Sequence, residues 1–281
     1  MKTKVWFVTG ASKGLGLALV HALLHKGYQV AATSRKLAEL KAAVPQGRAD
    51  AFLPLEVDLL KEDSVRQAID ATRARFGQID VVVNNAGYGL AGGLEELSDA
   101  EARANFDVNV FGALNVIRQA LPHLRAQRSG HIFNIASVAG FTGGFAGFGI
   151  YCSTKFAMHG FTEALEDEIK EFGIRATVVS PGYFRTNFLE SSSLVVPQHP
   201  IEDYKAVRKM QSLHEGSING NQAGDPVKAA EVLIRVAEQA EPVLHLFLGP
   251  DAYDMVEKKI EKVRKEMEAV RDLATATNLD K

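Results

Sequence analysis

The sequence predicts an α/β fold in one domain, with a parallel sheet of about seven strands covered by helices on both faces. Short apolar runs rich in β-branched or aromatic residues recur along the chain, separated by longer stretches with helical spacing. The runs are continuous rather than alternating, which is typical of parallel strands buried on both faces. A chain of 281 residues is long enough for two domains. The regular alternation nevertheless favours a single doubly wound domain over residues 1–281.

The expected strands follow one another at regular intervals. In chain order they are residues 5–9, 28–33, 51–57, 79–84, 131–136, 174–180 and 243–248. Between the first two strands, Leu15, Leu19 and Leu23 repeat every four residues and share one face of a helix. Comparable helical spacing between the later strands completes the strand–helix alternation.

Residues 183–224 depart from this alternation because they show no clean period. A long irregular segment in a compact domain is more often a functional loop than a misassigned element, so we expect a lid over the substrate. The lid ends at Asp225 and Pro226, which supply an N-cap and a first-turn signal for the next helix.

Residues 250–281 form a C-terminal helical extension. Its apolar residues repeat with 4-3-4-3 spacing among mixed charges, and they are Val256, Ile260, Val263, Met267 and Val270. Such a narrow apolar seam fits either a helix laid on its own domain or a contact between subunits.

Composition excludes several classes of function. The formal net charge of −2 gives no electrostatic case for binding nucleic acid or an acidic membrane. The single cysteine, Cys152, excludes an internal disulfide framework and a multi-thiolate metal site. The apolar run near the start is too short for a signal sequence, so we expect a cytoplasmic protein. The charge-free residues 132–154 contain glycines and polar side chains that fit a strand, a loop and a helix start better than a membrane span.

The first chemical signal follows the first strand, where residues 9–16 read TGASKGLG. Gly10, Gly14 and Gly16 permit a tight turn, the close approach of a pyrophosphate, and packing of the next helix against the strand. The phosphates would bind unpaired N–H groups at the start of that helix. This pattern predicts a dinucleotide-binding Rossmann fold.

The end of the second strand indicates which dinucleotide binds. An NAD site places an acidic residue there for the ribose 2′-hydroxyl, whereas this chain has Ser34 and Arg35. An acid would repel a 2′-phosphate, while Arg35 and Lys13 would pair with it. The residues therefore predict NADP.

Tyr151 and Lys155 form the second chemical signal. Residues four apart share a helix face, so the phenol and the ammonium can reach one site. A cation at about 4 Å, at an effective dielectric near 20, supplies the ~4 kcal/mol that lowers a tyrosine pKa by about three units. On this argument Lys155 makes Tyr151 a working acid/base.

The motifs occur in a characteristic order. They are TGxxxGxG at residues 9–16, Asn84-Asn85-Ala86-Gly87, Asn109, Ser137, Tyr151 with Lys155, and Pro181-Gly182 with Thr186. Over about residues 4–190 the chain resembles the short-chain dehydrogenase/reductase family, in its single-domain NAD(P)-dependent subgroup. Ser137 lies fourteen residues before Tyr151, one more than is commonest in that family, and we expect the glycine-rich loop 143–149 to absorb the difference.

The resemblance implies a role for each catalytic residue. Tyr151 would protonate the carbonyl oxygen, and Ser137 would hold that oxygen through its hydroxyl. Lys155 would lower the pKa of Tyr151 and bond the nicotinamide ribose, and Asn109 would hold a water that links Lys155 to solvent.

The resemblance also implies the cofactor site. Asp58 would contact the adenine, residues 85–87 would line the cofactor, and Pro181, Gly182 and Thr186 would flank the nicotinamide carboxamide. The full expected set is Gly10, Ser12, Lys13, Gly14, Leu15, Gly16, Ser34, Arg35, Asp58, Asn85, Ala86, Gly87, Tyr151, Lys155, Pro181, Gly182 and Thr186.

No metal site is expected. His21 and His25 share a helix face, but no glutamate lies between them and their helix already serves the glycine loop.

A second set of candidates concerns the substrate. The aromatic residues Phe141, Phe145 and Phe148 fit the core and a pocket wall equally well.

The sequence thus predicts an NADPH-dependent oxidoreductase that interconverts an apolar ketone or aldehyde and the corresponding alcohol. Apolar residues in the lid favour such a substrate, and they are Phe184, Phe188, Leu189, Leu194, Val195, Val196, Met210 and Leu213. A non-catalytic NADP(H) sensor is the alternative. A sugar-nucleotide epimerase fits less well, because it would carry a larger C-terminal substrate domain. Members of the family commonly form dimers or tetramers, so we expect a homo-oligomer.

Overall fold

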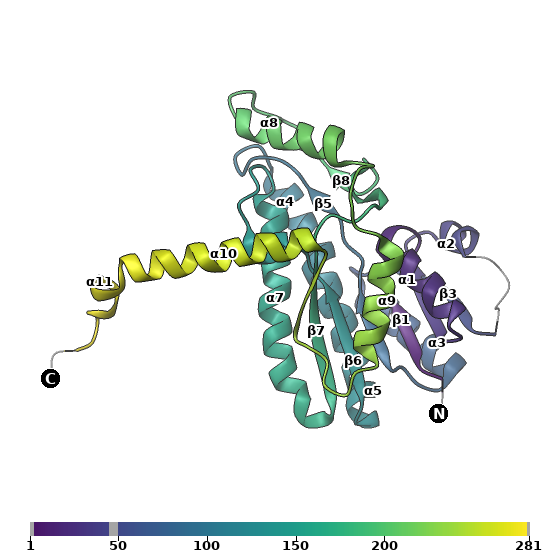
Figure 1. The fold of residues 1–281 in the computed structure, drawn as a ribbon. Helices are drawn as coiled ribbons and strands as arrows, with labels where there is room; N and C mark the ends of the chain where they lie inside the picture. Colours follow the sequence, from purple (N-terminus) through teal and green to yellow (C-terminus); the bar gives the residue numbers. More distant parts are fainter. Residues whose placement is uncertain (1–2, 45–49, 280–281) are drawn as a thin grey trace.

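A computed structural model describes residues 3–44 and 50–279. Within this part of the chain, seven strands form one parallel sheet in the order β3-β2-β1-β4-β6-β7-β9 (Figure 1). The strands are β1 (Val5–Val8), β2 (Gln29–Ser34), β3 (Phe52–Glu56), β4 (Val81–Asn84), β6 (Gly130–Ile135), β7 (Ile174–Pro181) and β9 (His245–Leu248). Each coincides with an apolar run in the sequence, so the doubly wound α/β prediction is confirmed.

Helices cover both faces of this sheet. One face carries α1 (Gly14–His25), α2 (Leu37–Ala43) and α9 (Pro226–Ala237). The opposite face carries α3 (Glu62–Phe76), α5 (Gly112–Gln127) and α7 (Gly149–Ile169). The remaining helical segments are α4 (Asp99–Phe106), η2 (Asp107–Phe111), α6 (Ala139–Thr142), η3 (Lys170–Phe172), η4 (Asn187–Leu189), α8 (Lys205–Ser212), η5 (Leu213–Ile218), α10 (Pro250–Ala269) and α11 (Arg271–Thr275).

Successive residues of the central strands supply both core layers. In β1, Trp6 and Val8 pack beneath α1 and α9, while Val5 and Phe7 pack beneath α3 and α5. All four side chains are buried, as expected where neighbouring strand residues point to opposite faces of a sheet covered on both sides.

The strand order reverses between β1 and β4, which are hydrogen-bonded neighbours on opposite branches of the winding. Ligands of open α/β sheets bind outside the carboxyl ends of the strands at such a switch point. The turn that follows β1 and the turn that follows β4 meet there, and these turns carry the first two motifs.

The segment 183–224 contains more regular structure than its sequence indicates. It includes β8 (Leu194–Val195), which pairs in parallel with β5 (Gly89–Leu90), as well as α8 and η5. The predicted end of the segment is confirmed, because the Asp225 carboxylate accepts a hydrogen bond from Val227 N at 2.8 Å and caps α9.

The charge-free residues 132–154 fold as part of β6, the short α6 and the start of α7. Across the described ranges, no helix combines the length and apolar character that a membrane crossing requires.

A buried histidine on β6 predicts sensitivity of the fold to acid. His131 stacks on Phe133, with ring centroids 4.0 Å apart, and its Nε2 is bonded to Thr177 Oγ1 at 2.9 Å. Burial lowers the pKa of His131 to about 3, whereas an unfolded histidine has a pKa of ~6.5. Between these values the unfolded chain binds a proton that the folded chain does not, so the free energy of unfolding falls as pH falls through this window.

We therefore expect the His131→Gln variant to lose less unfolding free energy than the wild type between pH ~6.5 and ~4, measured by urea denaturation. His25→Gln, at an exposed histidine on α1, is the matched control and should keep the wild-type slope. Identical slopes for all three proteins would remove His131 from the acid response.

Candidate functional site

The glycine loop brings free N–H groups to the switch point. Gly10 has a φ of 63°, and a Cβ there would lie 2.7 Å from Ala86 Cα, so the position requires glycine. Helix α1 begins at Gly14, and no side chain caps its first turn from the N-cap residue Lys13. Uncapped N–H groups at a helix start, under a loop that leaves room for backbone approach, suit a pyrophosphate.

The turn after β4 holds this loop in place. Thr9 Oγ1 accepts hydrogen bonds from Asn85 N at 3.0 Å and Ala86 N at 3.1 Å. The Asn85 amide in turn donates to the backbone oxygens of Thr9 and Gly10 at 3.0 and 2.9 Å. A Cβ at Gly16 would lie 2.4 Å from Asn85 Nδ2, so Gly16 permits this packing beneath the loop.

One cavity of about 930 Å³ runs from this loop to the catalytic residues predicted from the sequence. All but two of the predicted cofactor and catalytic residues line it. The exceptions are Gly16, which lies behind the loop, and Asn109, which is fully buried. Asp58 lines the end of the cavity near β3, where its Oδ1 accepts from Leu60 N at 3.1 Å.

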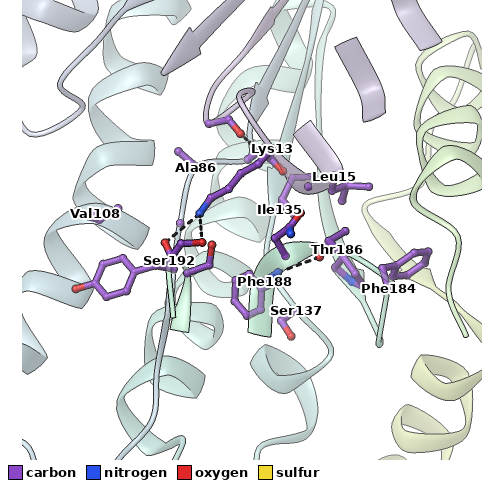
Figure 2. A pocket seen from close by; sticks show the side chains of 18 of the residues that line it. Lys13, Leu15, Ala86, Val108, Ile135, Ser137, Phe184, Thr186, Phe188 and Ser192 are labelled. Atoms are coloured by element: carbon purple, nitrogen blue, oxygen red, sulfur yellow. Dashed lines mark hydrogen bonds between the residues drawn. The ribbon is translucent and has the colours of Figure 1, made fainter. Parts of the chain in front are cut away.

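The other side of this end is cationic. Lys13 and Arg35 line the cavity, and the pKa of Lys13 is lowered first by burial and then by the charge of Arg35. Lys13 Nζ donates to Ser192 O at 3.0 Å and Ser192 Oγ at 2.9 Å, so it reaches across to the segment 183–224 (Figure 2). Within the described chain, no hydrogen bond or ion pair engages the Arg35 guanidinium. Arg35 is therefore the freer of the two cations predicted for a 2′-phosphate.

Tyr151 and Ser137 meet at the opposite end of the cavity. Both side chains line the cavity, and the Ser137 hydroxyl is near enough to influence the pKa of the Tyr151 phenol. Burial raises the pKa of the Tyr151 phenol above its usual value, and the Ser137 hydroxyl lowers it by a smaller amount. The phenol is therefore protonated at neutral pH.

This pKa differs from the sequence-based expectation that Lys155 lowers it. Lys155 is itself buried, and burial lowers its pKa to about 7. Its Nζ donates to Ile135 O at 2.8 Å and lies 5.9 Å from the centre of the Tyr151 ring. The sequence-based expectation considered only the attraction between the Lys155 ammonium and the Tyr151 phenolate. It left out the desolvation of both groups, which is the largest influence on both pKa values.

Asn109 lies directly behind this pair. It occupies the π-helical turn η2, where its Nδ2 donates to Tyr88 O at 3.0 Å and Thr154 Oγ1 at 3.1 Å. A Cβ at Gly87 would lie 2.9 Å from Asn109 Oδ1 and 3.6 Å from Lys155 Nζ. Asn109 thus orders the turn after β4 and the start of α7 from beneath the cavity.

The predicted apolar wall is present in part. Phe145, Phe148, Phe184, Phe188 and Leu189 line the cavity. Phe141 does not, because it packs on Phe247 with ring centroids 5.3 Å apart. The other lid residues of the prediction, Leu194, Val195, Val196, Met210 and Leu213, lie outside the lining.

The sequence did not reveal a polar pair in this wall. Tyr183 OH lies 2.9 Å from His214 Nε2, and His214 Nδ1 lies 2.8 Å from Met210 O. A carbonyl only accepts, so Nδ1 carries the proton and Nε2 accepts the Tyr183 hydroxyl proton. The two residues come from the turn after β7 and from η5, so no local pattern links them.

A second group of potential ligands lies outside the cavity. The side chains of His159, Glu163 and His245 offer ligand atoms within 4.8 Å of one another. His159 Nε2 is already bonded to Ser180 Oγ at 2.9 Å, and His159 and His245 come from α7 and β9. None of the three side chains lines the cavity.

Comparisons with known proteins agree with this geometry. The family model for short chain dehydrogenase matches residues 4–194. "Oxidoreductase BOA17" of Botryotinia fuckeliana is 37% identical over 277 residues, which cover 98% of this chain and 99% of that protein.

Solved structures extend the likeness to the whole chain. A short-chain dehydrogenase from Streptomyces avermitilis aligns with a TM-score of 0.90 and 32% identity, covering 99% of this chain and 100% of that one. An alcohol dehydrogenase from Thermococcus sibiricus, complexed with 5-hydroxy-NADP, aligns with a TM-score of 0.71 and 26% identity over 88% of this chain and 96% of its own. The cradle at the switch point is therefore a nicotinamide dinucleotide site, and the chain belongs to the short-chain dehydrogenase family of oxidoreductases.

Proposed function

We propose that this oxidoreductase uses NADPH to reduce an apolar ketone or aldehyde, with Tyr151 as the proton donor. The observation that carries the proposal is the distribution of charged and apolar residues along the cavity. At one end Lys13 and Arg35 line it, together with the Lys36–Glu39 ion pair and the carboxylates Glu56 and Asp58. At the other end Tyr151 and Ser137 line it beside aromatic side chains.

The dinucleotide would lie across the switch point. Its pyrophosphate would accept hydrogen bonds from the uncapped N–H groups at the start of α1. Arg35 would pair with the 2′-phosphate, and Lys13 would join it on release from Ser192. Lys155 would bond the nicotinamide ribose. When bound, NADPH supplies the hydride for the carbonyl carbon.

The protein supplies the proton and the orientation. Ser137 and Tyr151 would both donate to the carbonyl oxygen, stabilising negative charge as it develops there. Burial keeps Tyr151 protonated, so the phenol is ready to act as a general acid in the direction of reduction. Lys155, with a pKa lowered to about 7, can exchange a proton near neutral pH from its place beneath the ring.

The wall polarity supports an apolar substrate. Phe145, Phe148 and Phe188 present aromatic surface, and the Tyr183–His214 pair satisfies its own hydrogen bonds together with Met210 O. A polar substituent that bound against these aromatic side chains would lose water without gaining a hydrogen bond from them, which costs free energy.

The proposal is tested by NADPH oxidation with pairs of substrates that share a carbon skeleton. Medium-chain aliphatic ketones and aryl ketones are compared with the corresponding keto acids. We expect a higher kcat/KM for the uncharged member of each pair. Tight NADPH binding, followed by nicotinamide fluorescence, without turnover of any carbonyl would instead support a non-catalytic sensor.

A further inference from the structure

The C-terminal helix leaves the domain partway along its length. In α10, Ala252 and Val256 are buried against Val138 beside α6. Every residue described from Ile260 onward is exposed. Figure 1 shows this end of α10 projecting away from the sheet and its covering helices.

The projecting part carries an unpartnered apolar seam. Ile260, Val263, Met267 and Val270 are 45%, 37%, 62% and 50% exposed, although their 4-3-4-3 spacing places them on one side of the helix. A helix of this length without tertiary packing is only marginally stable in water. In the described part of the chain it is supported by ion pairs within the helix, which include Lys265–Glu261 at 2.7 Å and Lys262–Glu266 at 3.7 Å.

We propose that this seam pairs antiparallel with the same helix of a second copy of the chain. The charges that flank the seam carry the proposal. Glu257 and Arg264 lie on one flank, and Lys259 and Glu266 lie on the other. In an antiparallel pair, each flank of one helix lies against the same flank of the partner helix. The charges on the flanks then set the orientation and the register of the pair.

One register makes all of these flanking contacts attractive. With Ile260 opposite Val263 of the partner subunit, Lys259 faces Glu266 of the partner subunit. On the other flank Glu257 faces Arg264 of the partner subunit. Two-fold symmetry repeats each contact.

The competing arrangements bring like charges together. A shift of one heptad in one direction places Glu266 opposite Glu266 of the partner subunit. It also places Arg264 opposite Arg264 of the partner subunit. The opposite shift places Lys259 opposite Lys259 of the partner subunit and Glu257 opposite Glu257 of the partner subunit. A parallel pair places Lys259 against Arg264 of the partner subunit. Within α10, charge pattern and seam therefore favour the antiparallel orientation with Ile260 opposite Val263 of the partner subunit.

The proposed contact uses surface that the domain leaves open. Val256 is already buried on its own domain, so the open part of the seam begins at Ile260. Val270 of the partner subunit would reach Tyr253, which is 55% exposed. No residue described from Ile260 onward lines the cavity, so pairing and catalysis can be measured separately.

The test is the dimer Kd of the full chain, measured by sedimentation equilibrium at several salt concentrations. Lys259→Glu and Glu266→Lys each place like charges at two symmetric contacts. Each should weaken the dimer by about tenfold or more at low salt. Lys258→Glu makes the same charge change on the face away from the seam and is the matched control. It should keep the wild-type Kd.

Charge exchange distinguishes the proposed pair from other dimers. The double variant K259E/E266K restores opposite charges and should regain the wild-type Kd. An equimolar mixture of the two single variants should form heterodimers, because each supplies the charge that the other lacks. A wild type that is monomeric at every concentration, or a dimer whose Kd neither single variant changes, would overturn the proposal. Helix content by circular dichroism verifies that the variants fold.

Discussion

Tyr151→Phe is expected to lower kcat for ketone reduction by about 10²- to 10⁴-fold, the usual contribution of a positioned acid or base. The variant removes the only atom of Tyr151 that can donate a proton, and it leaves the ring that contacts Phe148 and Phe188. NADPH binding should change little, because the dinucleotide would be held mainly by the glycine loop, Arg35 and Lys155. The measurement is steady-state NADPH oxidation together with a fluorescence titration of NADPH.

A second phenol in the same cavity provides the control. Tyr88 lines the cavity, and Asn105 Nδ2 donates to its backbone oxygen at 3.1 Å. Tyr88→Phe should therefore keep turnover. Ser137→Ala should lower kcat, because it removes one donor to the carbonyl oxygen. Robust turnover by Tyr151→Phe with tight NADPH binding would take Tyr151 out of the mechanism.

The seven-stranded sheet could be predicted from the sequence because its signal is local. Each strand is a continuous apolar run, and runs such as 79–84 and 131–136 are bounded by turns that carry the motifs. The observed strands β4 and β6 differ from these runs only at their ends. Burial on both faces makes most strand positions apolar, so the pattern can be recognised without knowing which strands pair.

Features that depend on distant partners could not be predicted. The pairing of Gly89–Leu90 with Leu194–Val195 joins two short segments with no periodicity of their own. The Tyr183–His214 hydrogen bond likewise joins the turn after β7 to a later π-helical turn. The raised pKa of Tyr151 follows from burial in the assembled fold, and a motif carries no measure of burial.

The second large effect concerns the choice of dinucleotide. Arg35→Asp should change the ratio of kcat/KM for NADPH to that for NADH by about 10²-fold or more in favour of NADH. Loss of one hydrogen bond to a charged group accounts for ~1.5–3 kcal/mol, and each ~1.4 kcal/mol is tenfold. A carboxylate beside the 2′-phosphate adds repulsion, and at the end of β2 it would suit the 2′-hydroxyl of NADH.

Lys41→Asp is the control for this variant, because it makes the same change of charge at an exposed position of α2. It should leave the NADPH to NADH ratio unchanged at each salt concentration. Lys13 alone is expected to matter less than Arg35, since Lys13 must first leave Ser192 O and Oγ. A ratio unaffected by Arg35→Asp would mean that the 2′-phosphate does not lie against the end of β2. The discrimination would then rest on Lys13 and the lid that it contacts.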